Sequence, residues 1–262
     1  MNIWITGSSS GMGEAGAYRF AQDGHNILLT ALETEMDKLQ AVRQQCLTLG
    51  AADAAVLPFD FSDNTHLDRL AQQAWEAFDG LDVVYLNAGI SQRTTVLDTD
   101  PQMIRKIMEI DYFAPVLLAK QILPLMIERG GGQFAVTTSI AGYFGFPLRC
   151  TYSSAKHSLY GFFETLHAEN YSQNIRVTLV CPGRVRTNIS LYALDKGGVR
   201  HGKMDAGQAN GLPVDKAANR ICKAIYKKRR EVLVGRKELL MVYIKRFFPG
   251  LCARLGRKIA PM

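Results

Sequence analysis

Short runs of apolar residues alternate with longer helical patterns along most of this chain, and the first run begins at Asn2. A run that is apolar at consecutive positions predicts a strand buried on both faces, as in parallel sheets covered by helices. We therefore expect an α/β fold, a Rossmann-like doubly wound parallel sheet of about seven strands with helices on both faces. The predicted strands are Asn2–Thr6, Asn26–Thr30, Ala54–Phe59, Asp82–Leu86, Gln133–Thr138, Ile175–Cys181 and Glu231–Val234.

The chain length of 262 residues suits one large domain followed by a short extension. No repeat or low-complexity linker divides the alternating part, so we place one domain at 1–236 and a basic amphipathic extension at 237–262. The helical patterns that separate the strands are Gly11–Asp23, Glu33–Leu49, Asp63–Phe78, Pro101–Glu128 and Thr151–Tyr171.

The first predicted strand leads into a glycine-rich turn, which spans 6–13 and reads Thr-Gly-Ser-Ser-Ser-Gly-Met-Gly. Glycines allow a tight turn and let backbone N–H groups approach a pyrophosphate at a helix N-terminus. A plain strand-to-helix turn has the same pattern, but the position directly after an N-terminal strand favours a dinucleotide site. The candidate cofactor-binding residues here are Gly7, Ser9, Gly11, Met12 and Gly13.

Three further strand ends carry candidate ligand-binding residues, because open α/β sheets bind ligands beyond the carboxyl ends of their strands. Asp60 and Phe61 follow the third strand, where the carboxylate could equally begin a turn. A second group follows the fourth strand, where a plain turn is again the alternative. This second group is Asn87, Ala88 and Gly89, and the group after the sixth strand is Pro182, Gly183, Val185 and Thr187.

The region from 137 to 156 holds the catalytic candidates. Ser139 stands at the end of a predicted strand, and Tyr152 and Lys156 follow it in a predicted helix. Positions i and i+4 lie on one face of a helix, so the phenol and the ammonium can reach one site. An ammonium favours the phenolate form of a nearby phenol, and a serine that faces the phenol can hold a substrate oxygen. Together the three groups make a proton-transfer set.

A second pair with the same spacing, Tyr192 and Lys196, shows that the pattern alone is weak. No strand that ends in serine precedes this pair, and two glycines follow it at once, so the context favours Tyr152 and Lys156. The region Ile189–Leu212 is polar, contains glycine and has no clear periodicity, which is typical of a lid over a substrate site.

These motifs together resemble the short-chain dehydrogenase/reductase family over about residues 1–235. The resemblance lies in order and spacing as much as in identity. The pattern T-G-x-x-x-G-x-G comes first, N-A-G and a serine follow, and Y-x-x-x-K and P-G complete it. The family implies an NAD(P)(H)-dependent interconversion of a secondary alcohol and a carbonyl. A cofactor-binding scaffold or regulatory protein of the same fold, without turnover, is the alternative.

The resemblance also implies a role for each motif. Tyr152 would be the general acid in reduction and the general base in oxidation, Lys156 would stabilise its phenolate and bind the nicotinamide ribose, and Ser139 would orient the substrate oxygen. The glycine-rich turn would line the phosphates, and Asp60 would meet the adenine. Asn87 and Gly89 would lie near the adenine ribose, and Val185 and Thr187 near the carboxamide.

The chain departs from the family pattern at Asp111, where relatives usually carry an asparagine that kinks the helix and helps to hold a water beside the lysine. An aspartate can still accept a hydrogen bond from water. Its negative charge could pair with Lys156, or it could reduce the effect of the lysine charge on Tyr152. We therefore include Asp111 among the catalytic candidates and expect a changed pH profile.

The second departure concerns the choice between NAD and NADP. NAD-preferring relatives tend to carry an acid just after the second strand, and NADP-preferring ones an arginine nearby. Here these positions are Ala31 and Leu32, so neither the acid nor the arginine is present. The missing acid favours NADP slightly, with Ser8, Ser9 and Thr30 as candidate phosphate contacts.

The net charge of +7 arises at the C-terminal end. Between Lys227 and Lys258 there are 11 Lys/Arg residues and 2 Glu, whereas the rest of the chain has 20 basic and 22 acidic residues. The extension reads as a basic amphipathic segment with aromatic residues, which favours an anionic membrane surface. Its apolar side could instead pack on the domain or on a second subunit. Nucleic-acid binding is not expected, because no recognisable module accompanies the basic tail.

Composition limits the remaining classes. Five widely spaced cysteines without a C-x-x-C pair indicate reduced thiols, and no His cluster suggests a metal site. The N-terminus lacks the regions of a signal peptide, and the apolar run Tyr112–Ala119 is too short to span a membrane. We expect a cytoplasmic homodimer or homotetramer, with peripheral contact at the inner membrane surface through the extension. By analogy with relatives that have similar tails, the substrate would be a hydrophobic, steroid-, retinoid- or lipid-like small molecule.

Overall fold

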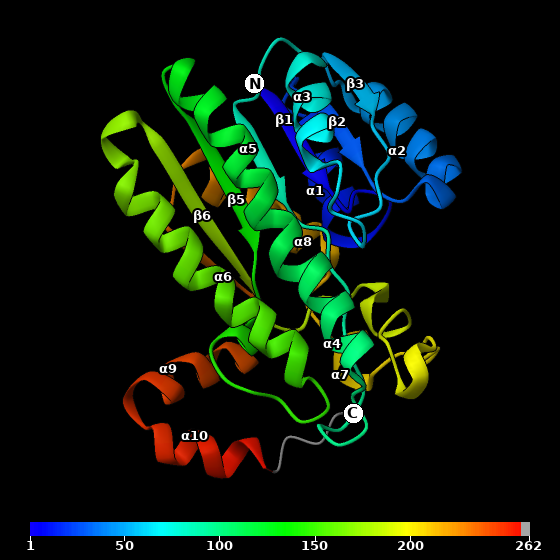
Figure 1. The fold of residues 1–262 in the computed structure, drawn as a ribbon, viewed down its shortest axis with the longest axis vertical. Helices are drawn as coiled ribbons and strands as arrows, with labels where there is room; N and C mark the ends of the chain where they lie inside the picture. The colour runs from blue at the N-terminus through cyan, green and yellow to red at the C-terminus, as the bar shows by residue number, and fades with distance from the viewer. Residues whose placement is uncertain (258–262) are drawn as a thin grey trace.

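A seven-stranded sheet forms the centre of the protein in the computed structural model, which describes residues 1–257. All strands are parallel in the order β3-β2-β1-β4-β5-β6-β7, so the chain starts in the middle of the sheet and builds each half outward (Figure 1). The predicted fold class is confirmed. The strands are β1 (Asn2–Thr6), β2 (Asn26–Thr30), β3 (Asp53–Val56), β4 (Val83–Leu86), β5 (Gly132–Thr137), β6 (Ile175–Pro182) and β7 (Glu231–Val234).

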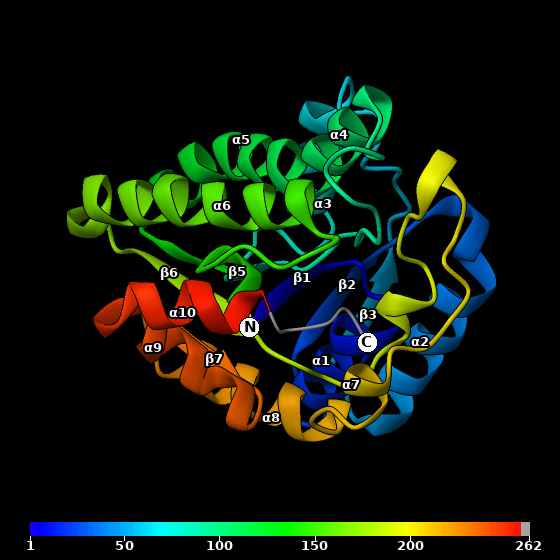
Figure 2. The same cartoon turned by 90° about the horizontal axis from the view of Figure 1, so that it is seen from below.

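Helices cover both faces of the sheet, as Figure 2 shows from below. One layer contains α1 (Gly11–Ala21), α2 (Met36–Leu49) and α8 (Val214–Tyr226). The other contains α3 (Leu67–Glu76), α4 (Pro101–Met108), α5 (Ala114–Glu128) and α6 (Cys150–Glu169). Each layer seals one apolar face of the strands, which is why the strands read as apolar at consecutive positions.

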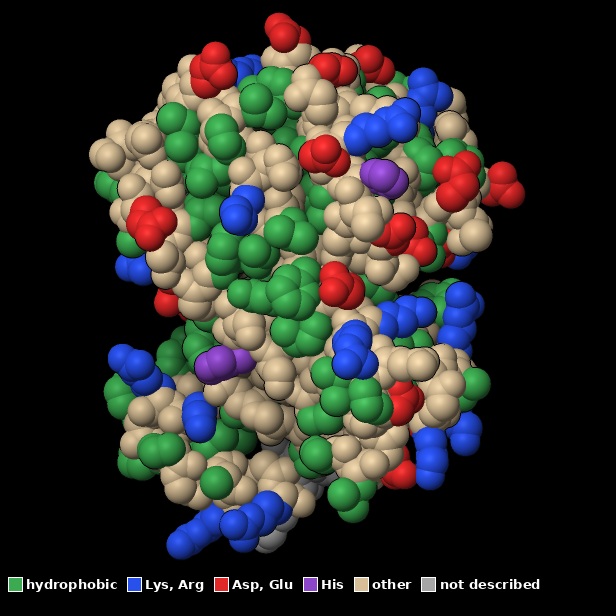
Figure 3. Space-filling view, viewed as in Figure 1, with side chains coloured by type: hydrophobic (Ala, Val, Ile, Leu, Met, Phe, Trp, Pro, Cys, Tyr) green, Lys and Arg blue, Asp and Glu red, His purple; other side chains and the backbone are tan. Residues whose placement is uncertain are grey.

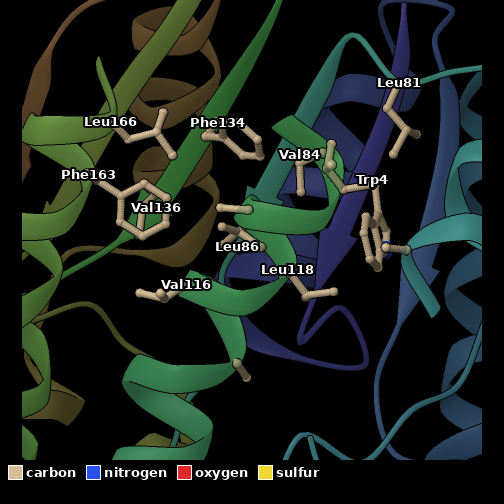
Figure 4. Packing of buried hydrophobic residues seen from close by; sticks show 14 of the residues in the cluster. Trp4, Leu81, Val84, Leu86, Val116, Leu118, Phe134, Val136, Phe163 and Leu166 are labelled. Atoms are coloured by element: carbon tan, nitrogen blue, oxygen red, sulfur yellow. The ribbon is translucent and has the colours of Figure 1, made fainter. Parts of the chain in front are cut away.

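The core beneath α5 and α6 is built from large side chains on β1, β4 and β5 (Figure 4). Trp4, Phe134 and Phe163 are fully buried there. The indole N–H of Trp4 donates to the Thr30 hydroxyl at 2.8 Å, so this buried polar group is satisfied. The central strands are thereby held rigidly, and the loops at their carboxyl ends have a fixed base.

Several predicted boundaries differ from the structure by up to four residues; the helix predicted at Asp63–Phe78, for example, is Leu67–Glu76. The third strand, predicted to end at Phe59, ends at Val56. Pro58 interrupts no bond to β2, because the N–H groups on either side of it, those of Leu57 and Phe59, are the ones that face β2. The chain nevertheless stays beside β2, since the Phe59 N–H donates to the Ala31 carbonyl at 2.8 Å. The predicted helix Pro101–Glu128 is continuous but contains a wider π-helical turn, Glu109–Phe113.

Within residues 1–257, the stretch Pro101–Glu128 is the one helix that is long and apolar enough to cross a membrane, a test that buried core helices also pass. Its inner side chains, such as Leu118 and Ile122, are buried against the sheet.

The described part of the C-terminal extension contains two short α-helices, α9 (Leu240–Phe247) and α10 (Pro249–Gly256). Residues 258–262 of the predicted extension lie outside the described residues. The two helices lie at the end of the molecule to which the carboxyl ends of the strands point (Figure 1). Val242 and Cys252 are buried with Ile140 and Phe144 of the loop after β5. One side of the extension therefore packs on the domain, beside the loop that carries Ser139.

The glycine-rich turn between β1 and α1 requires glycine for two different reasons. Gly7 has φ +66°, and a Cβ atom there would lie 2.7 Å from the Ala88 Cα. Gly13 has an ordinary φ, but a Cβ atom would overlap the carbonyl of Gly7 and lie 2.7 Å from the Asn87 amide nitrogen. The turn is therefore packed backbone to backbone against the loop after β4.

Replacing Gly13 by alanine tests this packing. We expect Gly13→Ala to lower the free energy of unfolding by about 1–3 kcal/mol, the usual cost of an overpacked site, and to lower the melting temperature. Gly16→Ala in the same helix is the control, because its Cβ atom would come no closer than 3.6 Å to Tyr85. Equal melting temperatures for the two variants would contradict the packing described here.

Candidate active site

Tyr152 and Lys156 lie on one face of α6 near its N-terminus, as predicted. The two side chains are 6% and 3% exposed, and the Lys156 Nζ lies 5.8 Å from the centroid of the Tyr152 ring. The side chain of Gln92 fixes the start of this helix, because its Oε1 accepts from the N–H groups of Thr151 at 3.0 Å and of Tyr152 at 3.3 Å. Nothing in the sequence marked Gln92, since a glutamine from a distant loop is not a typical cap.

The ammonium of Lys156 is held at two fixed points. Its Nζ donates to the Thr137 carbonyl at the end of β5 over 3.1 Å, and it lies 3.3 Å from the Asp111 Oδ2. A lysine anchored in this way keeps its charge beside Tyr152 instead of extending into solvent.

Asp111 is fully buried on the π-helical turn between α4 and α5. Its Oδ1 accepts from the Ile90 N–H at 2.8 Å. Burial raises the pKa of this carboxyl above its usual value, while the Lys156 ammonium acts in the opposite direction without cancelling the rise. Gly89 lies against the pair, because a Cβ atom there would be 3.2 Å from Nζ and 3.3 Å from each carboxyl oxygen. The predicted pairing of Asp111 with Lys156 is thus present.

Ser139 follows β5 and is 7% exposed. Its hydroxyl accepts from the Ala141 N–H at 3.1 Å and lies 3.5 Å from the Pro182 carbonyl. The turn that it begins packs on α6, since the Gly142 carbonyl lies 2.5 Å from the His157 Nδ1. The loop after β5 is thereby fixed beside the helix that carries Tyr152 and Lys156.

The glycine-rich turn fits a dinucleotide pyrophosphate. The first turn of α1 has no side-chain cap, which leaves its N–H groups free of side-chain partners at the end where the helix dipole favours an anion. The close packing at Gly7 and Gly13 brings backbone, without side chains, to this surface. Met12 is partly buried beside it, and Gly11 lies against Thr187.

Asn87 ties the turn to the neighbouring strands. Its amide nitrogen lies 3.2 Å from the carbonyls of Thr6 and Gly7, and its amide oxygen accepts from the Thr137 hydroxyl at 3.1 Å. The N–H of Ala88 donates to the Thr6 hydroxyl at 3.0 Å. The hydrogen bonds of the Asn87 side chain therefore join the glycine-rich turn to the end of β5.

The other predicted cofactor contacts are spread along the same sheet edge. Asp60 is exposed and accepts from the Ser62 N–H, whereas Phe61 is buried and lines a small apolar pocket with Ala88. The N–H of Gly183, which follows Pro182 at the end of β6, donates to the Val234 carbonyl at 2.9 Å. Val185 is buried. Thr187 accepts from the amide of Gln208 at 3.2 Å, and Gln208 belongs to the predicted lid region, Ile189–Leu212.

The candidate phosphate contacts for NADP are engaged within the protein. Ser8 and Thr30 are fully buried, so neither hydroxyl reaches a ligand. The Ser9 hydroxyl donates to the Glu35 carboxylate at 2.7 Å. Burial works to raise the pKa of Glu35, but hydrogen bonds from Lys38 and Ser9 outweigh it and hold the pKa below its usual value. An anion that the sequence did not indicate therefore lies beside the turn.

The region Ile189–Leu212 folds over this edge in short turns and one helical turn, α7 (Ala206–Ala209). The second Tyr–Lys pair belongs to it and forms no site: Tyr192 is exposed, and Lys196 is bound to Asp98 at 2.8 Å. Among residues 1–257, no group of three or more His, Cys, Asp or Glu side chains could hold a metal ion, and all five cysteines are free.

Comparison with known proteins defines the class. The family described as short chain dehydrogenase matches residues 1–196. The chain is 36% identical over 259 residues to dehydrogenase/reductase SDR family member 7B of Mus musculus, covering 97% of this chain and 79% of that protein. It is 34% identical over 253 residues to dehydrogenase/reductase SDR family protein 7-like of Drosophila melanogaster, covering 95% and 77%.

Solved structures share the fold. A short chain dehydrogenase/reductase from Burkholderia phymatum in complex with NAD superposes with a TM-score of 0.82 at 21% identity, covering 95% of this chain and 94% of that chain. A short-chain dehydrogenase from Sphingobium yanoikuyae in complex with NADPH gives 0.79 at 20% identity, covering 99% and 95%. The chain belongs to the short-chain dehydrogenase/reductase family, and the predicted class of enzyme, an alcohol–carbonyl oxidoreductase, is confirmed.

The raised pKa of Asp111 gives the sign of a pH effect. A carboxyl whose pKa is higher in the folded state stabilises the fold fully at pH values below its unfolded pKa, and this contribution is lost as the pH rises through the folded pKa. Asparagine in its place does not titrate. We expect the melting temperature of the wild type, relative to Asp111→Asn, to fall as the pH is raised from acid towards neutral.

Activity should change with the same substitution. Without the carboxylate, the charge of Lys156 acts on Tyr152 alone, so the pH–rate profile for alcohol oxidation should move to lower pH in Asp111→Asn. Superimposable pH–rate profiles for the two proteins would rule out the role given to Asp111.

Proposed function

We propose that this protein is an NAD(P)(H)-dependent oxidoreductase that interconverts a secondary alcohol and a carbonyl through Tyr152, Lys156 and Ser139. The observation that carries the proposal is the buried arrangement on α6, in which the Lys156 ammonium is anchored by the Thr137 carbonyl and Asp111 within 5.8 Å of the Tyr152 ring centroid. A fixed cation beside a buried phenol is suited to proton transfer.

When bound, the nicotinamide would supply a hydride in reduction and accept one in oxidation. The residues of the chain transfer the proton. In reduction the Tyr152 hydroxyl gives its proton to the carbonyl oxygen of the substrate, and the Lys156 ammonium stabilises the phenolate that remains. In oxidation the same phenolate removes the hydroxyl proton. Ser139 holds the reacting oxygen at the carboxyl end of β5, where its loop is fixed against α6.

Removing the phenolic hydroxyl tests this mechanism and separates the enzyme from a non-catalytic scaffold. Tyr152→Phe should lower kcat by about 10²–10⁴, the usual contribution of general acid–base catalysis, while the dissociation constant of NADH, followed by fluorescence, stays within a factor of two or three. Tyr160→Phe on the same helix is the control, since its hydroxyl is bound to Thr138 and Glu231. Turnover by Tyr152→Phe at the wild-type rate would refute the mechanism.

The cofactor preference rests on Glu35. The sequence slightly favours NADP because the acid after the second strand is missing, but the Glu35 carboxylate lies beside the turn through its bond to Ser9. A carboxylate repels a 2′-phosphate and can accept from ribose hydroxyls, so it favours NAD. Glu35→Gln should tighten NADPH binding relative to NADH by about tenfold, the effect of one charge contact. An unchanged ratio of the two dissociation constants would show that Glu35 does not select the cofactor.

We further propose that the extension lies on an anionic membrane surface, at the inner face of the cytoplasmic membrane, and that the substrate is hydrophobic. Val242 and Cys252 pack on the domain, so the packing alternative accounts for one side of the extension. The opposite side remains exposed, and Lys and Arg side chains surround it in Figure 3. Its exposed apolar residues are Leu240, Tyr243, Phe247, Phe248 and Leu251. An apolar face bordered by basic residues suits an interfacial helix.

Vesicle binding tests this surface. The double variant Phe247→Ser/Phe248→Ser should reduce binding to vesicles of phosphatidylglycerol and phosphatidylcholine at least tenfold, since each buried phenyl ring is worth about 1.5–3 kcal/mol. Val96→Ser/Leu97→Ser is the control, because these side chains are 74% and 97% exposed in the loop between β4 and α4, outside the extension. Equal sedimentation of both variants with the vesicles, or no binding by the wild type, would dispose of the membrane contact.

The assembly proposed from the family resemblance is a homodimer or homotetramer built on the predicted helices Pro101–Glu128 and Thr151–Tyr171, the second of which is α6 in the structure. Exposed apolar side chains on the first of these, Ile104 and Phe113, support it. Light scattering of the purified protein distinguishes these states from a monomer.

A further inference from the structure

Three arginines from three different loops meet beneath the lid region. Arg93 comes from the loop after β4, Arg149 directly precedes α6, and Arg184 follows β6. Both Arg93 and Arg149 bind the Asp205 carboxylate, Arg149 at 3.4 Å. The Arg184 guanidinium lies against Gly207, where a Cβ atom would be 2.8 Å from its Cζ. The cluster is therefore assembled at the carboxyl ends of neighbouring strands, where doubly wound sheets bind ligands.

The charges in this cluster do not balance. Asp205 is the one carboxylate to which Arg93 and Arg149 are bound among residues 1–257, and Arg184 makes no ion pair in the same part of the chain. The Arg93 side chain is only 3% exposed, yet its Nε has no hydrogen-bond partner. Burial and then the nearby charge of Arg93 lower the pKa of Arg149 to about 10, so it remains charged at neutral pH. A buried cation such as Arg93, which shares its one carboxylate with a second arginine, is costly unless a ligand adds negative charge.

The position of Arg149 links the cluster to the chemistry. Arg149 precedes Tyr152 by three residues, which is less than one helical turn, and the Gln92 side chain that holds the Tyr152 N–H is adjacent in sequence to Arg93. An anion bound by these arginines would therefore belong to a molecule whose other part reaches Tyr152. The cofactor pyrophosphate is a different anion, because its place is the uncapped N-terminus of α1.

We propose that Arg93, Arg149 and Arg184 form a binding site for an anionic group on the substrate, a carboxylate or a phosphate monoester carried by the carbonyl or alcohol compound. Guanidinium groups match both anions with paired hydrogen bonds. The anion would supply the missing negative charge and share Arg149 with Asp205, so the lid region and the substrate are held by the same side chain. This proposal rests on the function proposed above and narrows its substrate class to amphiphilic compounds with a charged head.

A matched set of ketones tests the proposal. Methyl ketones of increasing chain length that end in a carboxylate, a phosphate monoester or a methyl ester are compared with NADH or NADPH as reductant. For the wild type we expect kcat/KM for one of the anionic series to exceed that of the ester by about 10–100-fold, the effect of charged hydrogen bonds. The two anionic series distinguish the carboxylate from the phosphate.

Substitution of the arginines assigns this selectivity. Arg149→Gln and Arg184→Gln should each reduce the ratio of anion to ester kcat/KM at least tenfold, and Arg149→Lys should keep part of it. Arg69→Gln is the control, because Arg69 is exposed on α3, and it should leave the ratio unchanged. The affinity for NADH should stay unchanged in all variants. A wild type that prefers the ester at every length, or arginine variants that lower acid and ester turnover equally or weaken NADH instead, would overturn the proposal.

A binding measurement keeps the two proposals separable. Calorimetric titration with a long-chain carboxylate and with an alkyl phosphate should show binding to the wild type and at least tenfold weaker binding to Arg149→Gln. If no ketone is reduced but this difference in binding is found, the proposed chemistry fails and the anion site stands. If ketones are reduced and the two proteins bind both anions equally, the anion site fails and the chemistry stands.

Discussion

The buried ion pair between Asp111 and Lys156 is the interaction around which the active site is built. It joins the π-helical turn before α5 to α6, and through the Thr137 carbonyl it joins both to the end of β5. Gly89 leaves just enough room for the pair, and the Ile90 N–H satisfies the second carboxyl oxygen. A buried carboxylate and ammonium gain little net stability, since desolvation offsets their attraction. The benefit of the pair is that it fixes a cation beside Tyr152.

The sheet supplies the geometry that this pair requires. Parallel strands end at one edge, so residues more than a hundred positions apart in sequence, such as Gly7 and Tyr152, are brought to one side of the molecule. Each loop at this edge is then tied to its neighbour: Asn87 binds the glycine-rich turn, and the turn after Ser139 packs on α6. The extension contributes as well, because the Glu238 carboxylate accepts from the Arg184 N–H at 2.9 Å.

Features set by local sequence could be predicted, and features set by distant partners could not. The apolar runs gave the seven parallel strands, and the spacing of Tyr152 and Lys156 placed both on one helix face. The carboxylate of Asp111 could be expected to pair with Lys156, because the resemblance to the family indicated that position 111 lies beside the lysine. The sequence did not indicate Gln92 at the start of α6, Glu35 beside Ser9, or the binding of Arg93 and Arg149 to Asp205. These contacts join side chains from separate loops, for which no short-range pattern exists.

A double-mutant cycle on Asp111 and Lys156 tests the central claim most directly. If Asp111 acts through the lysine, the double variant Asp111→Asn/Lys156→Met will have the same kcat/KM for alcohol oxidation as Lys156→Met at every pH, although Asp111→Asn alone changes the profile. Such non-additivity is the signature of two residues that act as a unit. If the effects of the two substitutions on kcat/KM instead multiply across the pH range, Asp111 acts independently of Lys156, and the account of this site is wrong.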